Sequence, residues 1–147
     1  MNPLTIITPC SRPENLQHLK QSIKFNQVSQ WIIVYDNTKN SFLKLFNHPK
    51  ILELPSNLIS LAGHAQRNLA IDKTSDGLIY NLDDDNIIHP NFWRILPNFS
   101  ATKINLFNIE NHPRFNHLNL SNPGPGTVDT SMFCIDRKLI GEKRWLP

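Results

Sequence analysis

The chain has 147 residues, which is enough for one domain with a single hydrophobic core. Hydrophobic residues make up 39% of it and charged residues only 18%, a balance that excludes a charged, disordered segment. The formal net charge is +3 and the basic residues are scattered, which argues against a nucleic-acid-binding protein. No signal peptide is apparent, and no apolar run approaches the ~20 residues of a membrane span. We therefore expect one cytoplasmic domain over residues 1–147.

The two cysteines, Cys10 and Cys134, lie far apart in the sequence and beside apolar segments. Such positions favour reduced, buried thiols over a disulfide bond. The chain is also rich in Asn, Ile and Lys, which is typical of AT-rich bacterial or viral genomes.

The first strand is predicted at residues 4–8, which are rich in β-branched side chains. Ser11 and Glu14 have the spacing of a capping box, and Pro13 suits the first turn of a helix. The apolar face of that helix recurs at spacings of three and four residues: Leu16, Leu19 and Ile23.

Strands and helices then alternate up to the middle of the chain. We expect strands at residues 30–35, 51–54 and 78–82, a short helix at 41–47 and a helix at 62–71. This alternation predicts an α/β fold with a mostly parallel, Rossmann-like sheet flanked by helices.

The second half of the chain is richer in loops and predicts a small antiparallel part. We expect a short helix at residues 90–96, strands at 103–109, 114–120 and 131–135, and a loop at 122–126. A final helical turn at 137–140 is predicted between an Asp136 cap and Gly141.

Three adjacent carboxylates, Asp83, Asp84 and Asp85, follow the apolar run at residues 78–82. Two such charges about 4 Å apart repel by ~1 kcal/mol in water, and by more in a cleft. Carboxylate oxygens are the ligands that Mg²⁺ and Mn²⁺ prefer, so a divalent ion would relieve this repulsion. The alternative is an acidic turn that caps the helix after it.

Polar residues also follow the other predicted parallel strands. They form the segment 8–12 and the pair Asp36 and Asn37, and Arg67 lies on a helix beside them. In open parallel sheets, ligands bind outside the carboxyl ends of the strands. The chain has no Gly-rich dinucleotide fingerprint and no Walker-type loop, so a metal and arginines would hold the phosphates of a nucleotide diphosphate.

Four ordered motifs carry a resemblance to a known family: Thr8-Pro9-Cys10-Ser11-Arg12-Pro13, Trp31 to Asp36, Gln66 to Ala70, and Asp83-Asp84-Asp85-Asn86. In this order they resemble glycosyltransferases of the GT-A fold. The chain is similar to the metal-dependent inverting glucuronyltransferases (family 43) and to compact family-2-like sugar transferases. The segment 128–133 resembles the acceptor-side strand of those enzymes.

The resemblance implies roles for the acidic motif, with a nucleotide sugar as donor, UDP as its nucleotide, and Mn²⁺ or Mg²⁺ as cofactor. Asp85 would bind the metal directly. Asp84 would contact the donor sugar or the ribose, and Asp83 the ribose.

The resemblance implies further donor contacts. Asp36 would contact the nucleoside, and Arg67 the diphosphate or the donor sugar. Three residues of the segment 8–12 would border the base and the ribose: Thr8, Pro9 and Arg12. Asp129 would lie on the acceptor side, facing a glycan or another hydroxyl acceptor.

The general base is where this chain departs from the family, which carries it in a segment beyond the acceptor strand. Asp129 and Glu142 are the remaining catalytic candidates. Three explanations of the short chain are open: it is an unusually short enzyme, a fragment, or a homo-oligomer that completes its site.

Two alternative functions also remain, a nucleotidyltransferase and a non-catalytic nucleotide-sugar-binding module. Nucleotidyltransferases usually have a Gly-rich first loop, and the segment from Pro9 to Pro13 is not Gly-rich.

Overall fold

The sheet has six strands in the order β3-β2-β1-β4-β6-β5. The computed structural model describes residues 2–38, 41–59, 61–108, 120–123 and 128–145. The strands are β1 (Leu4–Cys10), β2 (Gln30–Asp36), β3 (Ile51–Ser56), β4 (Leu78–Asn81), β5 (Asn105–Leu106) and β6 (Phe133–Asp136).

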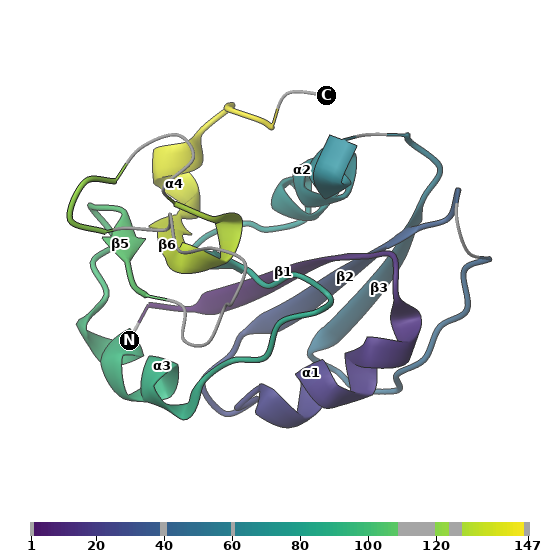
Figure 1. Ribbon diagram of the computed structural model, residues 1–147, viewed down its shortest axis with the longest axis horizontal. Coiled ribbons are helices and arrows are strands. Elements are labelled where there is room, and N and C mark those ends of the chain that lie inside the picture. Colours follow the sequence, from purple (N-terminus) through teal and green to yellow (C-terminus); the bar gives the residue numbers. More distant parts are fainter. Residues whose placement is uncertain (1, 39–40, 60, 109–119, 124–127, 146–147) are drawn as a thin grey trace.

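Helices cover both faces of this sheet. They are α1 (Leu16–Ser22), α2 (His64–Asp72), α3 (Pro90–Ile95) and α4 (Arg137–Ile140), with 3-10 turns η1 (Pro13–Asn15), η2 (Leu61–Gly63), η3 (Leu96–Asn98) and η4 (Thr130–Met132). Figure 1 shows α1 and α3 on one side of the sheet and α2 and α4 on the other. No helix of the described ranges is both long and apolar enough to cross a bilayer.

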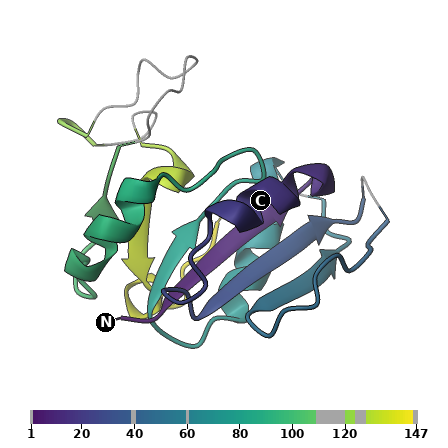
Figure 2. The same ribbon diagram turned by 90° about the horizontal axis from the view of Figure 1, so that it is seen from below.

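Most of the sheet is parallel, as the alternation of elements predicts. Strand β1 pairs in parallel with β2 and β4, and β2 pairs in parallel with β3. Strand β6 runs antiparallel to both β4 and β5, and Figure 2 shows it (yellow) pointing opposite to β4 (teal). The carboxyl ends of β1, β2 and β4 and the amino end of β6 therefore meet at one edge of the sheet.

The alternation of side chains along each strand divides the core between the two faces. Leu4 and Ile6 of β1 pack toward α1 and α3, together with the fully buried Trp31. Ile7 and Ile32 pack toward α2, where Ala70 and Ile71 are buried. Because both faces are covered, the side chains of β1, β2 and β4 are mostly buried and mostly apolar.

The prediction of a helix at residues 41–47 is wrong, since residues 41–48 form no helix. The carboxylate of Glu53, only 8% exposed, accepts hydrogen bonds from the N–H groups of Leu45 and Phe46, both at 2.9 Å. It also accepts one from the Tyr35 hydroxyl at 2.7 Å. A buried carboxylate needs hydrogen-bond donors. Because the N–H groups of Leu45 and Phe46 bind Glu53, they do not form the hydrogen bonds of a helix.

The predicted capping box is also wrong, because the turn that begins at Pro13 has no side-chain cap. The hydroxyl of Ser11 donates instead to Asp84. At the other end of the chain, Asp136 accepts a hydrogen bond from the N–H of Lys138 at 2.9 Å, and Gly141 ends α4, both as predicted.

Two predicted strands are shorter than expected, and two further predicted elements cannot be compared with the structure. The strand expected at 103–109 is limited to Asn105–Leu106, and the one expected at 131–135 is Phe133–Asp136 after the turn η4. The strand expected at 114–120 lies almost wholly outside the described residues, as does most of the loop at 122–126. Cys10 and Cys134 are both free and buried, as predicted.

Candidate functional site

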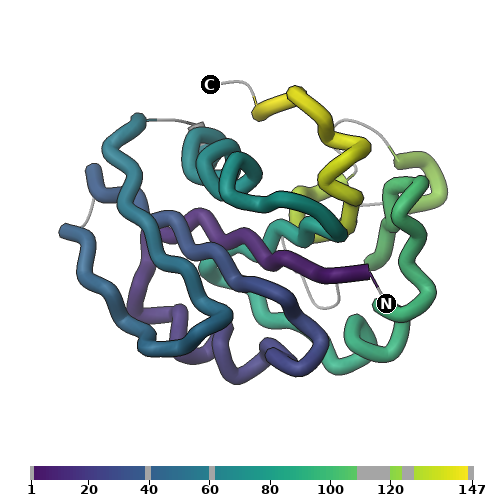
Figure 3. The backbone as a smooth tube through the Cα atoms, turned by 180° about the vertical axis from the view of Figure 1, so that it is seen from behind, coloured from purple at the N-terminus to yellow at the C-terminus, as the bar shows by residue number. Residues whose placement is uncertain are grey.

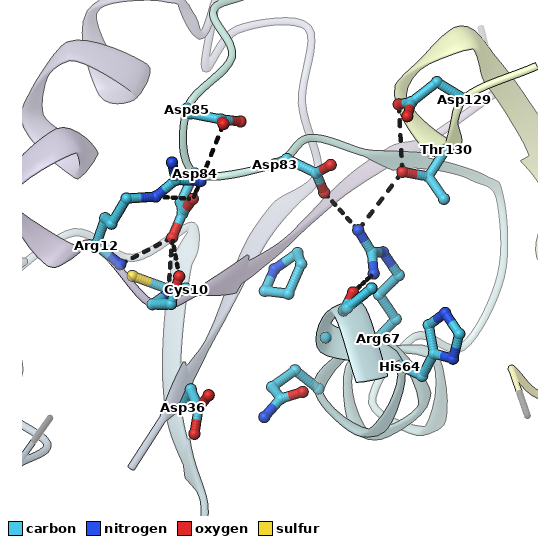
Figure 4. A pocket seen from close by; sticks show the side chains of 15 residues that line it. Cys10, Arg12, Asp36, His64, Arg67, Asp83, Asp84, Asp85, Asp129 and Thr130 are labelled. Atoms are coloured by element: carbon cyan, nitrogen blue, oxygen red, sulfur yellow. Dashed lines mark hydrogen bonds and ion pairs between the residues drawn. The ribbon is translucent and has the colours of Figure 1, made fainter. Parts of the chain in front are cut away.

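A cleft of about 370 Å³ opens at the edge of the sheet where the carboxyl ends of β1, β2 and β4 meet. Eight of the ten predicted site residues line it: Pro9, Arg12, Asp36, Arg67, Asp83, Asp84, Asp85 and Asp129. They come from segments far apart in the sequence and reach one place because parallel strands end at the same edge (Figure 4).

Asp84 joins the end of β1 to the acidic loop after β4. Its Oδ2 accepts hydrogen bonds from the N–H groups of Ser11 at 2.6 Å and Arg12 at 2.8 Å. Its Oδ1 accepts from Nε of Arg12 at 2.9 Å and also from Nη2 (Figure 4). The side chain is 3% exposed, so these donors compensate a carboxylate that has lost its water.

Arg12 also reaches the last carboxylate of the motif. Its Nη2 lies 3.0 Å from Oδ2 of Asp85. Asp85 is 51% exposed and Arg12 is 46% exposed, so this pair lies at the mouth of the cleft. The hydrogen bond with Asp84 raises the pKa of the Arg12 guanidinium above its usual value. Arg12 is therefore a fixed positive charge between two carboxylates.

Arg67 forms the opposite wall from the first turns of α2. Its Nη2 lies 2.5 Å from Oδ1 of Asp83 and 3.5 Å from Oγ1 of Thr130, and its Nη1 donates to the Ala62 carbonyl (Figure 4). The guanidinium is 4% exposed, whereas Asp83 is 28% exposed. Because these contacts fix the buried guanidinium of Arg67 in place, an anionic ligand has to enter the cleft to reach it.

The chain enters α2 through two left-handed residues, Ala62 with φ 49° and Gly63 with φ 75°. A Cβ on Gly63 would lie 2.8 Å from Cβ of Pro9, which is closer than carbon atoms approach. Glycine therefore permits the start of α2 to pack against the end of β1, and this contact brings Arg67 to the cleft.

Burial raises the pKa of Asp83, and the charges of Asp129 and Asp85 raise it further, although Arg67 opposes the shift. Burial, followed by the charge of Asp84, raises the pKa of the Cys10 thiol to about 12. Cys10 is thus an inert thiol at neutral pH, although it lines the cleft.

The structure places two predicted site residues away from the cleft. Thr8 is fully buried, and its hydroxyl oxygen accepts a hydrogen bond from the Trp31 indole at 2.9 Å. The side chain of Thr8 points into the core because it follows Leu4 and Ile6 on the same face of β1. Glu142 is exposed after α4 and does not line the cleft.

Two residues that line the cleft also have local structural roles. Asp129 caps η4, and its Oδ1 accepts from the N–H of Ser131 at 2.9 Å and from the Ser131 hydroxyl at 2.6 Å. Asp36 accepts at Oδ1 from the N–H of Thr38 at 3.2 Å in the turn after β2. One oxygen of each carboxylate is therefore engaged locally.

Seven residues that line the cleft were not singled out as site residues from the sequence, although three of them belong to the predicted segment 8–12 or to the motif 66–70: Cys10, Ser11, Ala62, Gly63, His64, Gln66 and Thr130. His64 precedes Arg67 by three residues on α2, a spacing that puts both on one helix face, so this signal was present. Thr130 follows Asp129 directly. Ala62 and Gly63 are recognised as part of the site only from the tertiary structure.

Comparison with protein-family models finds no match for this chain, and comparison with curated proteins finds none either. Among the residues that the structure describes, no group of three or more His, Cys, Asp and Glu side chains is arranged to hold a metal ion.

Proposed function

We propose that this protein is a metal-dependent glycosyltransferase with a GT-A-like fold. It would transfer a sugar from a nucleotide diphosphate sugar, with UDP as the nucleotide, to an acceptor hydroxyl with inversion. The observation that carries the proposal is the meeting of Arg12, Arg67 and the Asp83–Asp85 motif in one cleft at the carboxyl edge of a parallel sheet. Such edges are the ordinary ligand-binding place of open α/β sheets.

The charges of the cleft support a ligand that combines a cation with an anion. Five carboxylates and two guanidinium groups line it: Asp36, Asp83, Asp84, Asp85, Asp129, Arg12 and Arg67. Each arginine already neutralises a carboxylate, which leaves an excess of negative charge. A divalent ion bound to the carboxylates would offset this excess of negative charge. The ion and the arginines would then neutralise the negative charge of a bound diphosphate.

The residues present fit Mn²⁺ or Mg²⁺ held jointly with a substrate. These ions commonly use one or two protein carboxylates plus phosphate oxygens and water, so a site with fewer than three protein ligands is suitable. Asp85 is the exposed carboxylate of the motif and would hold the ion, with Asp83 nearby in the same cleft. When bound, the ion would stabilise the negative charge that develops on the departing nucleotide diphosphate.

The other residues have separate tasks in this proposal. Arg67 would bind the diphosphate or the donor sugar, and Asp36 the nucleoside. Pro9 and Arg12 would border the base and ribose. Asp84 would position Arg12 and the acidic loop instead of contacting sugar, because the segment at residues 11–12 engages both of its oxygens.

Asp129 is the better placed of the two candidate bases, since it lines the cleft and Glu142 does not. A base must take the proton of the acceptor hydroxyl as the sugar is transferred. Both hydrogen bonds that Ser131 donates go to Oδ1 of Asp129, so Oδ2 would be the atom that receives the proton.

A non-catalytic nucleotide-sugar-binding module is the second candidate function. The observation that favours it is the capping role of Asp129, which accounts for this residue without catalysis. In that case the cleft would bind donor and metal and would transfer nothing.

Titration with UDP and Mn²⁺ tests the site. We expect UDP binding that requires Mn²⁺ and that Asp85→Asn weakens by about tenfold or more, because one metal ligand is lost. Asp76→Asn is the matched control: Asp76 is an exposed aspartate just before β4, at the opposite edge of the sheet. Binding without a metal requirement, or equal binding by Asp85→Asn, would remove the proposal.

Release of UDP from UDP-sugars separates the enzyme from the binding module. An enzyme should release UDP slowly with water and faster with a suitable acceptor, and Asp129→Asn should lower the rate by about 10²-fold or more without weakening UDP binding. Tight binding with no release from any UDP-sugar would favour the module.

A further inference from the structure

A second cavity, of about 530 Å³, lies on the α2 side of the sheet, away from the acidic motif. It exists because α2 packs on β1 and β2, whereas the neighbouring part of this face, over β4 and β6, has only the four-residue helix α4 beside it. Figure 3 shows the C-terminal segment (yellow) passing beside α2 (teal) on this side of the molecule.

The walls of this cavity are mainly apolar. They include Ile71 of α2, Ile79 of β4, Phe133 and Ile135 of β6, and Leu139 and Ile140 of α4. Leu139 is 41% exposed although it lines the cavity, so the apolar surface is open to ligand. A volume of this size and a mostly apolar lining are typical of small-molecule sites.

One buried polar atom in this lining has no partner. Asn81 is 3% exposed, and its Oδ1 accepts no hydrogen bond from the residues that the structure describes. It follows Ile79 by two residues along β4, so both side chains point to the same face. Buried polar side-chain atoms normally have a hydrogen-bond partner, and an unpaired one indicates that a donor from outside the chain belongs there.

The charged residues of the lining are all basic. Lys103, Lys143 and Arg144 line the cavity and no acidic residue does. Arg144 lies 2.5 Å from Asp72, which compensates its charge. Within the described ranges neither lysine forms an ion pair, so both ammonium groups can neutralise an anion.

We propose that this cavity binds an anionic amphipathic molecule with an apolar chain, a hydroxyl or amine group and a carboxylate or phosphate. The chain would lie on the isoleucines of β4 and β6. The hydroxyl or amine would donate a hydrogen bond to Oδ1 of Asn81, and the anionic group would face Lys103 and Lys143. This site is separate from the cleft of the acidic motif and does not depend on sugar transfer.

Trp145 provides an internal reporter for this site. It lines the cavity, and Asn68 fixes its backbone through two hydrogen bonds, to N at 2.8 Å and to O at 2.9 Å. Trp31 and Trp93 are buried in the core on the other face of the sheet. A change in tryptophan fluorescence on binding should therefore come mainly from Trp145.

The test titrates the protein with three probes: ω-hydroxydecanoate, decanoate and decanediol. We expect saturable binding of ω-hydroxydecanoate, seen by calorimetry and by tryptophan fluorescence. Decanoate should bind about fivefold more weakly because it lacks the donor for Asn81, and decanediol about tenfold more weakly because it lacks the charge. Equal binding of all three probes, or no saturable binding of any, would overturn the proposal.

Two variants locate the binding. Asn81→Ala should abolish the preference for ω-hydroxydecanoate over decanoate. Leu139→Glu places a carboxylate at the rim and should weaken both anionic probes by about tenfold. Its matched control is Leu43→Glu, because Leu43 is a 69% exposed leucine that lines neither cavity.

If Asn81→Ala does not fold, the Leu139→Glu variant still decides the test. Unchanged binding of the anionic probes by a folded Leu139→Glu variant would overturn the proposal. So would sedimentation showing a dimer that Leu139→Glu dissociates, since a second copy would then cover the cavity.

Discussion

Asp84 accepts two hydrogen bonds from Arg12 in the wall of the cleft, one from its backbone N–H at 2.8 Å and one from its Nε at 2.9 Å. The two residues are 72 positions apart, so this contact ties the end of β1 to the loop after β4. The shape of the cleft depends on it, because the same loop carries Asp83 and Asp85.

Replacing Asp84 by Asn should destabilise the fold. The amide offers one acceptor oxygen in place of two and leaves the guanidinium of Arg12 without its buried counter-charge. Breaking a buried pair costs ~3 kcal/mol or more, and we expect about 2 kcal/mol here because Arg12 is half exposed. Urea unfolding measures the loss. Asp76→Asn serves as control and should change the free energy of unfolding by less than ~0.5 kcal/mol.

Removing Arg12 should strengthen Mn²⁺ binding in the absence of nucleotide. The guanidinium lies 3.0 Å from Oδ2 of Asp85 and competes with any cation for that oxygen. Exposed ion pairs contribute up to ~1 kcal/mol, so Arg12→Ala should tighten Mn²⁺ binding by about two- to fivefold. Mn²⁺ titration followed by electron paramagnetic resonance measures this, with the exposed Arg94→Ala as control. Weaker Mn²⁺ binding in Arg12→Ala would contradict the competition.

The contribution of Asp83 to the free energy of unfolding should decrease as pH rises. Burial raises its pKa in the folded protein above the usual value of 3.8, so between these two values the folded chain binds more protons than the unfolded chain. Stability then falls with rising pH across that window. Asp83→Asn does not titrate, so the stability of wild type relative to this variant should fall from about pH 3.8 upward and become constant above the raised pKa. Urea unfolding over a pH series measures the difference, and a rise with pH would show that Arg67 dominates instead.

Gly63→Ala should disturb the cleft more than Gly141→Ala does. Both glycines have positive φ, 75° and 57°, so alanine is strained at either position; Gly141, with ψ −125°, lies in a region that is more costly for alanine than the left-handed helical conformation of Gly63. Only at position 63 would the new Cβ also meet Pro9, at 2.8 Å, whereas nothing lies within 4 Å at position 141. We expect Gly63→Ala to lose about 2 kcal/mol or more of stability and to weaken UDP binding. Unchanged UDP binding by Gly63→Ala would mean that the start of α2 shifts without disturbing the cleft.

Local patterns account for most of the predicted elements. Strands β1, β2 and β4 are rich in apolar and β-branched side chains, and α4 is bounded by an aspartate cap and a glycine, all of which depend on near neighbours in the sequence. The parallel sheet follows from alternation of strands and helices. Since parallel strands end at one edge, the meeting of Arg12, Arg67 and the acidic motif could be predicted before any coordinates were known.

The wrong predictions share one physical cause, which is a distant partner that outweighs a local preference. Glu53 takes the N–H groups of Leu45 and Phe46, so the apolar segment at 41–47 forms no helix. Asp84 takes the hydroxyl of Ser11 across 73 positions, so the capping box does not form. A buried carboxylate must be satisfied, and no pattern within four residues reveals which donors it will recruit.

The sequence by itself determined the order of the strands and helices along the chain and the clustering of carboxylates and arginines at one edge. Only the tertiary structure decided which of these side chains remain open to a ligand. Thr8 turned into the core, Asp84 became enclosed by Ser11 and Arg12, and Asn81 was left without a partner in a cavity beside α4. Whether a polar side chain stays accessible to a ligand depends on the neighbours that pack against it in the folded protein, and those neighbours lie tens of residues away along the chain.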